Sequence, residues 1–234
     1  MSPFDARANP TPGKLPESFC VMDCAALART TGYSAQSLRE LRDALLEVDV
    51  ASIYYHFWGG LLRPALDDPE YMNDFAVWVG RQLRDQVLAE RLAMIDAAAQ
   101  PTLEDLRSEL VELCDDRLDT LESPLWVNRD RAFYFLSARL VVIPTGRFIH
   151  APAELPAALS HFSRGSIFYH FVDARRRRED GRDDLRAWVE DHDGGASAPI
   201  AARLAAVDPF QGSLVQLKRQ VINAIEAGLQ EVSR

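Results

Sequence analysis

The chain has 234 residues, 47% of them hydrophobic, which is enough apolar surface for one large domain or two small ones and argues against disorder of the whole chain. Its 35 acidic and 26 basic residues give a net charge of −9, which argues against a protein whose main task is to bind nucleic acid or an anionic membrane. No stretch is apolar enough to span a bilayer, and residues 1–18 lack the pattern of a secretory signal, so we expect a cytoplasmic protein.

The first half of the chain begins with a Pro-rich segment, residues 1–18, which we expect to be a flexible arm. A strand after it is weakly indicated, because CAALARTTGYSA at residues 24–35 lacks the β-branched run typical of strands. Helices follow. Ser37 and Glu40 form a capping-box pattern before apolar residues at helical spacing. The next helix contains SIYYHF and must end near Pro64, because proline is not tolerated in a helix interior.

The remaining helices of the first half are indicated by caps and apolar spacing. Asn73 or Asp74 is expected to cap a third helix. A short helical turn then leads to Pro101 and Thr102, where a longer helix begins. The third helix has one apolar face, formed by Phe75, Trp78, Val79 and Leu83.

The second half follows a join at residues 122–132. Its first element, FYFLSARLVVIP at residues 133–144, is rich in aromatic and β-branched residues and predicts a strand, and the TGR after it predicts a turn. The half closes with a helix, for which Ser213 and Gln216 form a second capping-box pattern.

An internal match relates the two halves. The hexapeptide SIYYHF at residues 52–57 recurs as SIFYHF at residues 166–171, with five of six residues identical and a shift of 114 residues. Such a period excludes short solenoid repeats of about 20–50 residues. Other matched pairs, first half before second, are Phe19 and Phe133, Thr31 and Thr145, Gly32 and Gly146, Glu40 and Glu154, Leu45 and Leu159, Asp74 and Asp184, and Trp78 and Trp188.

We therefore predict a tandem duplication, with a first repeat unit at residues 19–121 and a second at residues 133–234. Duplicated units of domain size usually pack with a pseudo-twofold relation, because surfaces that were once self-complementary remain roughly so. The expected fold class is mainly α (α+β), in which each unit is a short strand or hairpin followed by about five helices.

The repeated hexapeptide defines the candidate site. On a helix, Ser52 and His56 share one stripe with Gly60 and Arg63, and the second half repeats the stripe. Among the histidines, this is the one matched pair, since the other three have no counterpart in the opposite half. The candidate binding residues are His56, Arg63, Tyr55 and Asp74 in the first half, and His170, Arg177, Tyr169 and Asp184 in the second.

Three interpretations of these residues stay open. A buried histidine needs partners for both ring nitrogens, so each matched histidine could simply join the second helix of its unit to the aspartate at the start of the third. Alternatively, the side chains line a ligand-binding groove in which Arg63 and Arg177 hold a phosphate or carboxylate, unless these arginines only meet the acidic loops at residues 67–68 and 179–180. The third interpretation is acid–base or metal chemistry.

Sequence motifs of known chemistry are missing. There is no P-loop, dinucleotide fingerprint, nucleophile elbow or HExxH, and Cys20, Cys24 and Cys114 lack a metal-type spacing. We therefore expect free thiols, no cofactor and no metal ion, and assign no catalytic residue. The four arginines at 175–178 are followed at once by acidic residues, which favours a solvated mixed-charge surface over a nucleic-acid site.

Several motifs together resemble a known prokaryotic family. They are Ser52-Ile53-Tyr54-Tyr55-His56, Asn73-Asp74-Phe75 with Trp78, residues 88–96 (LAERLAMID) and residues 103–107 (LEDLR). This order is similar to that of domain of unknown function 5752, here in tandem duplicate. The second half departs from the pattern at residues 183–185 and 213–217. The resemblance implies no particular activity and no catalytic residues.

The function expected from the sequence is a non-enzymatic binding or interaction module that uses a groove beside the SIYYHF and SIFYHF helices. Its partner would be a protein or a small anionic ligand. The alternative is an enzyme that acts on an anionic small molecule, with His56 or His170 as general base and Arg63 or Arg177 holding the anion.

Overall fold

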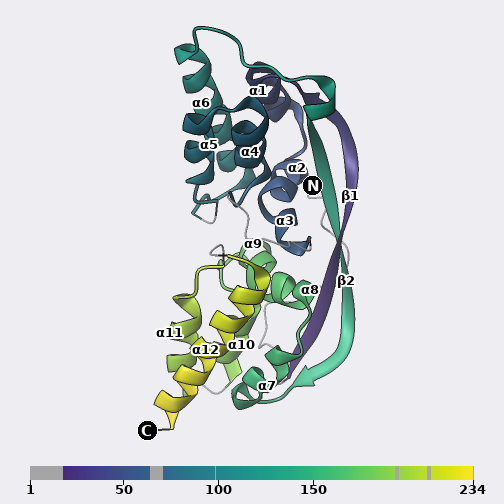
Figure 1. The fold of residues 1–234 in the computed structure, drawn as a ribbon. Helices are drawn as coiled ribbons and strands as arrows, with labels where there is room; N and C mark the ends of the chain where they lie inside the picture. The colour runs from purple at the N-terminus through teal and green to yellow at the C-terminus, as the bar shows by residue number, and fades with distance from the viewer. Residues whose placement is uncertain (1–17, 64–70, 98, 193–194, 210–211, 234) are drawn as a thin grey trace. The chain divides into compact units, whose positions relative to one another are not determined.

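A computed structural model describes residues 18–63, 71–97, 99–192, 195–209 and 212–233 of the chain. The fold is mixed α+β: two strands, β1 (Phe19–Ala35) and β2 (Phe133–Ile149), pair in a two-stranded antiparallel sheet, and helices make up most of the rest (Figure 1). Most of the segment predicted as a flexible arm, residues 1–17, lies outside the described residues. Among the described residues, no helix combines the length and the apolar character needed to cross a bilayer.

Each strand is 17 residues long, so both are longer than the short strands predicted, and the turn predicted at residues 145–147 is wrong because β2 continues through it. Gly32 lies inside β1 with φ of +90°, a conformation typical of a glycine in a β-bulge. The Thr31 hydroxyl holds the strand there, since it donates to the carbonyl of Phe135 at 2.7 Å and accepts from the amide of Tyr33 at 3.2 Å. The glycine therefore kinks the strand and does not end it.

The same arrangement recurs in β2, where Gly146 has φ of +72°. The Thr145 hydroxyl donates to the carbonyl of Val21 at 2.6 Å and accepts from the amide of Arg147 at 3.2 Å. A sequence pattern cannot separate a bulge from a turn here, because glycine with positive φ serves both.

The chain divides into two compact units. The first unit comprises residues 24–143 and 210–216, and the second comprises residues 1–23, 144–209 and 217–234. The residues of β1 and β2 are thus shared between the units: the start of β1 belongs with the helices of the second half, and the start of β2 with those of the first.

The described residues of the first unit form five helical segments, besides one 3₁₀ turn. They are α1 (Leu38–Glu47); α2 (Val50–Tyr54) continued by the π-helix η1 (Tyr55–Gly59) and α3 (Gly60–Leu62); α4 (Asp74–Trp78) continued by the π-helix η2 (Val79–Leu83); α5 (Gln86–Ala93); and α6 (Leu103–Thr120). A 3₁₀ turn, η3 (Arg129–Arg131), precedes β2. Helix α6 packs against α1 and α5, and α4 packs against α5.

Helix boundaries in this unit follow the caps in the sequence. The Ser37 side chain accepts from the amide of Glu40 at the start of α1, as predicted. The helix that contains SIYYHF ends at Leu62, which confirms the predicted stop before Pro64. Helix α4 is capped by Asn73, whose Oδ1 accepts from the amide of Ala76 at 2.8 Å.

The described residues of the second unit also form five helical segments. Its helices are η4 (Pro152–Glu154) with α7 (Leu155–Ser160); α8 (Arg164–Ile167) continued by the π-helix η5 (Phe168–Asp173) and α9 (Ala174–Arg177); α10 (Asp184–His192); α11 (Ala198–Ala205); and α12 (Leu214–Val232). The predicted capping box of α12 is present, because Ser213 and Gln216 exchange side-chain to main-chain hydrogen bonds.

Glycine sets the distance between α11 and α12. A Cβ on Gly228 would lie 2.6 Å from the Cα of Ile200, well inside van der Waals contact. The two helix backbones therefore approach closely at this point, and no other residue type fits without a shift.

Candidate functional site

The predicted residues of the first half lie together in one cluster. Nδ1 of His56 is 2.9 Å from Oδ2 of Asp74, and Nη2 of Arg63 donates to both carboxylate oxygens of Asp74, at 2.8 and 2.9 Å. The guanidinium of Arg63 lies over the Tyr55 ring, 5.6 Å from its centroid. We call these four residues the first cluster.

The first cluster also binds the strand. The amide of Leu136 donates to Nε2 of His56 at 3.0 Å, and the hydroxyl of Ser52 donates to the carbonyl of the same residue at 2.7 Å. Ser52 and His56 are one helical turn apart, so together they satisfy both main-chain groups of one strand residue. Helix side chains therefore take the place that a third strand would occupy.

The protonation state of His56 follows from its partners. Because an amide N–H can only donate, Nε2 must accept, and the ring proton is on Nδ1, where it points at the Asp74 carboxylate. Burial lowers the pKa of His56 below its ordinary value, and this effect exceeds the opposing effect of Asp74. The imidazole is thus neutral in the folded protein and has both nitrogens engaged.

The charge of Asp74 is stabilised by its neighbours. Burial by itself raises the pKa of this carboxyl group, but the hydrogen bond from His56 and the charge of Arg63 outweigh burial and leave the pKa below its ordinary value. The sequence offered Asp74 as a possible helix cap as well. That possibility is excluded, because Asn73 caps α4 and leaves the Asp74 carboxylate for His56 and Arg63.

The predicted residues of the second half form a matching second cluster. Nδ1 of His170 is 2.9 Å from Oδ2 of Asp184, and Nε2 accepts from the amide of Met22 at 2.8 Å. Arg177 donates to the same carboxylate oxygen at 2.8 Å and lies over the Tyr169 ring, 4.2 Å from its centroid. The pKa of Asp184 is lowered, because His170 and Arg177 together outweigh its burial.

Exposure differs within each cluster. The histidines are 4% and 3% exposed, whereas the side chains of Arg63 and Arg177 are 51% and 38% exposed. A molecule in solution would therefore reach either cluster at its arginine, while the imidazoles lie beneath. Of the acidic loops considered as partners of these arginines, residues 67–68 lie outside the described residues.

Both histidines lie within π-helical turns, η1 and η5. Such turns are rare and often occur at functional sites. In η1 the Tyr55 ring passes so close to Gly59 that a Cβ there would lie 2.5 Å from Cδ2 of the ring. A side chain at position 59 would therefore displace the Tyr55 ring.

Two parts of this arrangement were not assigned from the sequence. The bond from Ser52 to the strand is consistent with its place in the predicted stripe, although Ser52 was not selected as a site residue. The strand amides of Leu136 and Met22 give no signal, because every residue except proline has such a group.

Metal ligands are not gathered at either cluster. In the described ranges, no three His, Cys, Asp or Glu side chains are arranged so that they could hold an ion. Each cluster brings together an imidazole, a carboxylate, a guanidinium and a phenol ring.

Comparison with known proteins gives a family and one solved structure. The model of a family described as "Family of unknown function (DUF5752)" matches residues 16–226. The chain is also similar to the structure of OrfY from Thermoproteus tenax, with a TM-score of 0.77 and 30% sequence identity over 92% of this chain and 97% of that one. A search of curated proteins finds no significant match.

Proposed function

We propose, from the premise that this chain belongs to the family of unknown function DUF5752, that it is a non-enzymatic binding or interaction module. Its contact points would be the two exposed arginines, Arg63 and Arg177, at the ends of the SIYYHF and SIFYHF helices. The partner would present a carboxylate or phosphate, either on a protein surface or on a small molecule, because guanidinium groups suit both anions.

One observation supports this proposal over an enzyme: both ring nitrogens of each matched histidine are already bonded inside the protein. A general base needs a free lone pair within reach of the substrate proton. To act in this way, His56 or His170 would have to release the strand amide. The enzymatic alternative therefore requires a rearrangement that the binding proposal does not.

We also propose that the chain is a duplicated unit, with copies at residues 19–121 and 133–234 and a join at 122–132. Equivalent contacts at matched positions support this proposal. Each histidine bonds the aspartate at the start of the next long helical segment and a main-chain amide of a strand. Each strand threonine donates to a strand carbonyl before a glycine with positive φ.

In this proposal, the strand of each copy donates a main-chain amide to the histidine of the other copy. His56 of the first copy accepts from Leu136, which belongs to the strand of the second, and His170 of the second copy accepts from Met22, which belongs to the strand of the first. Two single units that exchanged their strands in a dimer would have the same contacts. Fusion of two copies of their gene would then keep these contacts within one chain.

The experiment is affinity purification from the native lysate with paired variants. We expect Arg63→Gln together with Arg177→Gln to lose partners that the wild type retains, because neutral glutamine removes the charge that the partner would contact. The matched control is Arg91→Gln with Arg203→Gln, two arginines of similar exposure that pair with Asp116 and Glu231 away from the clusters.

Identical partner profiles for the two double variants would overturn the arginine contact. The enzymatic alternative makes a different prediction. In a screen of anionic small molecules, turnover that is lost in a folded His170→Gln protein and kept in the arginine control would favour a general base.

A further inference from the structure

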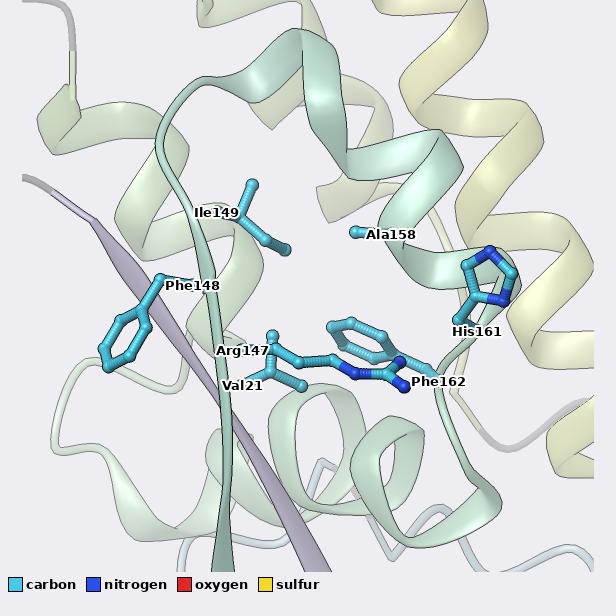
Figure 2. Close-up of a pocket in the computed structure, with 7 residues that line it drawn as sticks. All are labelled: Val21, Arg147, Phe148, Ile149, Ala158, His161 and Phe162. Carbon is cyan, nitrogen blue, oxygen red and sulfur yellow. The ribbon is translucent and has the colours of Figure 1, made fainter.

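The second unit has a hollow that shares no residue with either cluster. It has a volume of about 460 Å³ and lies between the strands and the end of α7 (Figure 2). Ligand pockets in proteins commonly measure about 300–1,000 Å³. Its lining residues are Val21, Arg147, Phe148, Ile149, Ala158, His161 and Phe162.

The floor of the hollow is apolar. Val21 and Ile149 come from the two strands and Phe162 from the segment after α7, and these three side chains are 2%, 2% and 5% exposed. Their burial fixes them in the core of the unit, so the hollow has a preformed apolar surface. A molecule in the hollow would contact the small part of these side chains that stays exposed.

The rim contains two groups that favour an anion. Arg147 extends from β2 across the hollow, with its guanidinium directed toward the side on which Phe162 and His161 lie (Figure 2). Within the described ranges, neither the Arg147 guanidinium nor the His161 ring has a hydrogen-bond or ion-pair partner. Both side chains are exposed.

We propose that this hollow binds a small organic monoanion, a carboxylate attached to a hydrocarbon or aromatic body. The body would cover the floor formed by Val21, Ile149 and Phe162, and the carboxylate would accept hydrogen bonds from Arg147, with His161 on the opposite rim. This site is separate from the arginine contacts proposed above, so either proposal can fail without the other.

The first half lacks the same chemistry at the matched positions. With the shift of 114 residues, Arg147 corresponds to Tyr33, His161 to Glu47 and Phe162 to Val48. The arginine and the histidine of the rim are thus replaced by a phenol and a carboxylate. The proposed specificity for an anion therefore belongs to the second half alone, and the first half supplies the residues for a swap variant.

The test is titration of the ¹⁵N-labelled full chain with octanoate, followed by amide chemical shifts. We expect saturable shifts centred on residues 147–149 and 158–162. Arg147→Gln should weaken the apparent affinity at least about tenfold, because a charge-assisted hydrogen bond is lost. Arg139→Gln, which removes the same charge from the same strand away from the hollow, should bind octanoate as the wild type does.

Two comparison ligands separate the parts of the proposal. Octanamide has the same body without the charge, and inorganic phosphate has the charge without the body, and both should bind at least about tenfold more weakly than octanoate. The swap variant, Arg147→Tyr with His161→Glu, should abolish octanoate binding while its spectrum stays that of a folded protein.

Three results would overturn the site. The first is octanoate shifts spread over the surface, the second is equal affinity of Arg147→Gln and the wild type, and the third is octanamide binding as tightly as octanoate. The proposal also fails if Arg147→Gln and Arg139→Gln weaken binding equally, since the effect would then come from net charge.

Discussion

The imidazole of His56 accepts a hydrogen bond from the main-chain amide of Leu136 at 3.0 Å, across 80 residues of sequence. The same ring donates to Asp74 through its other nitrogen. One side chain therefore joins the second helical segment, the third helical segment and a strand. The loss of that ring would leave the Leu136 amide without its acceptor and would leave the half-buried Asp74 carboxylate with Arg63 but without the donor of His56.

His56→Leu should lower the free energy of unfolding by about 2–4 kcal/mol, because leucine fills much of the space but satisfies neither neighbour. Urea denaturation followed by circular dichroism measures the change. His150→Leu is the matched control, since His150 is exposed and its ring lies outside both clusters. If His56→Leu is as stable as the control, the ring does not hold these elements together.

Asp183 should make stability depend on pH in a direction unusual for an aspartate. Its side chain is 1% exposed and accepts from the amide of Arg186, and burial raises its pKa to about 6. Because the folded protein binds this proton more tightly than the unfolded chain, the stabilisation is complete below about pH 4 and is lost as the pH rises through about 6.

Asp183→Asn removes this ionisation. Relative to the wild type, we expect its free energy of unfolding to rise by roughly 3 kcal/mol between pH 4 and pH 7. An amide is tolerated at the matched position of the first half, where Asn73 caps α4 and donates to the carbonyl of Leu92. A stability difference between the variant and the wild type that does not change with pH would contradict the raised pKa.

Gly228→Ala should destabilise the second unit by about 1–3 kcal/mol, although alanine is the better helix former, because its Cβ would clash with the backbone of Ile200 on α11. Thermal unfolding measures the effect. Gln230→Ala on the exposed face of α12 is the control and should be neutral or slightly stabilising. An alanine at position 228 that stabilised the protein would show that α11 and α12 can separate without cost.

A cut in the join should leave the two pieces bound to each other. Each compact unit contains residues from both sides of the exposed residues 122–124, because residues 1–23 belong with residues 144–209 and β2 begins among the helices of the first half. After a specific protease site is inserted there and cleaved, we expect both pieces in one peak of a size-exclusion column, and separation only in denaturant. Two separate peaks without denaturant would mean that each half keeps its own strand.

Local features of this protein were available from the sequence. The caps of α1 and α12 and the stop before Pro64 depend on neighbouring residues, and the predicted positions agree with the structure. The side chains of both clusters were also predicted to be close, because helical spacing and the paired aspartates place them together. The cap of α4 was narrowed by the same local rules to Asn73 or Asp74, and the structure shows that it is Asn73.

Only the tertiary structure showed which strand donates its amide to each histidine ring. It alone also showed the hollow beside α7. The strands beginning at Phe19 and Phe133 resemble each other, so the sequence alone cannot say whether His56 meets its own strand or the other one. The prediction of a turn at residues 145–147 was wrong for a related reason: positive φ is a local property, but whether the chain continues in the sheet depends on a partner strand more than 100 residues away. The pairing of distant strands depends on side-chain packing between segments, so no single segment of the sequence determines it.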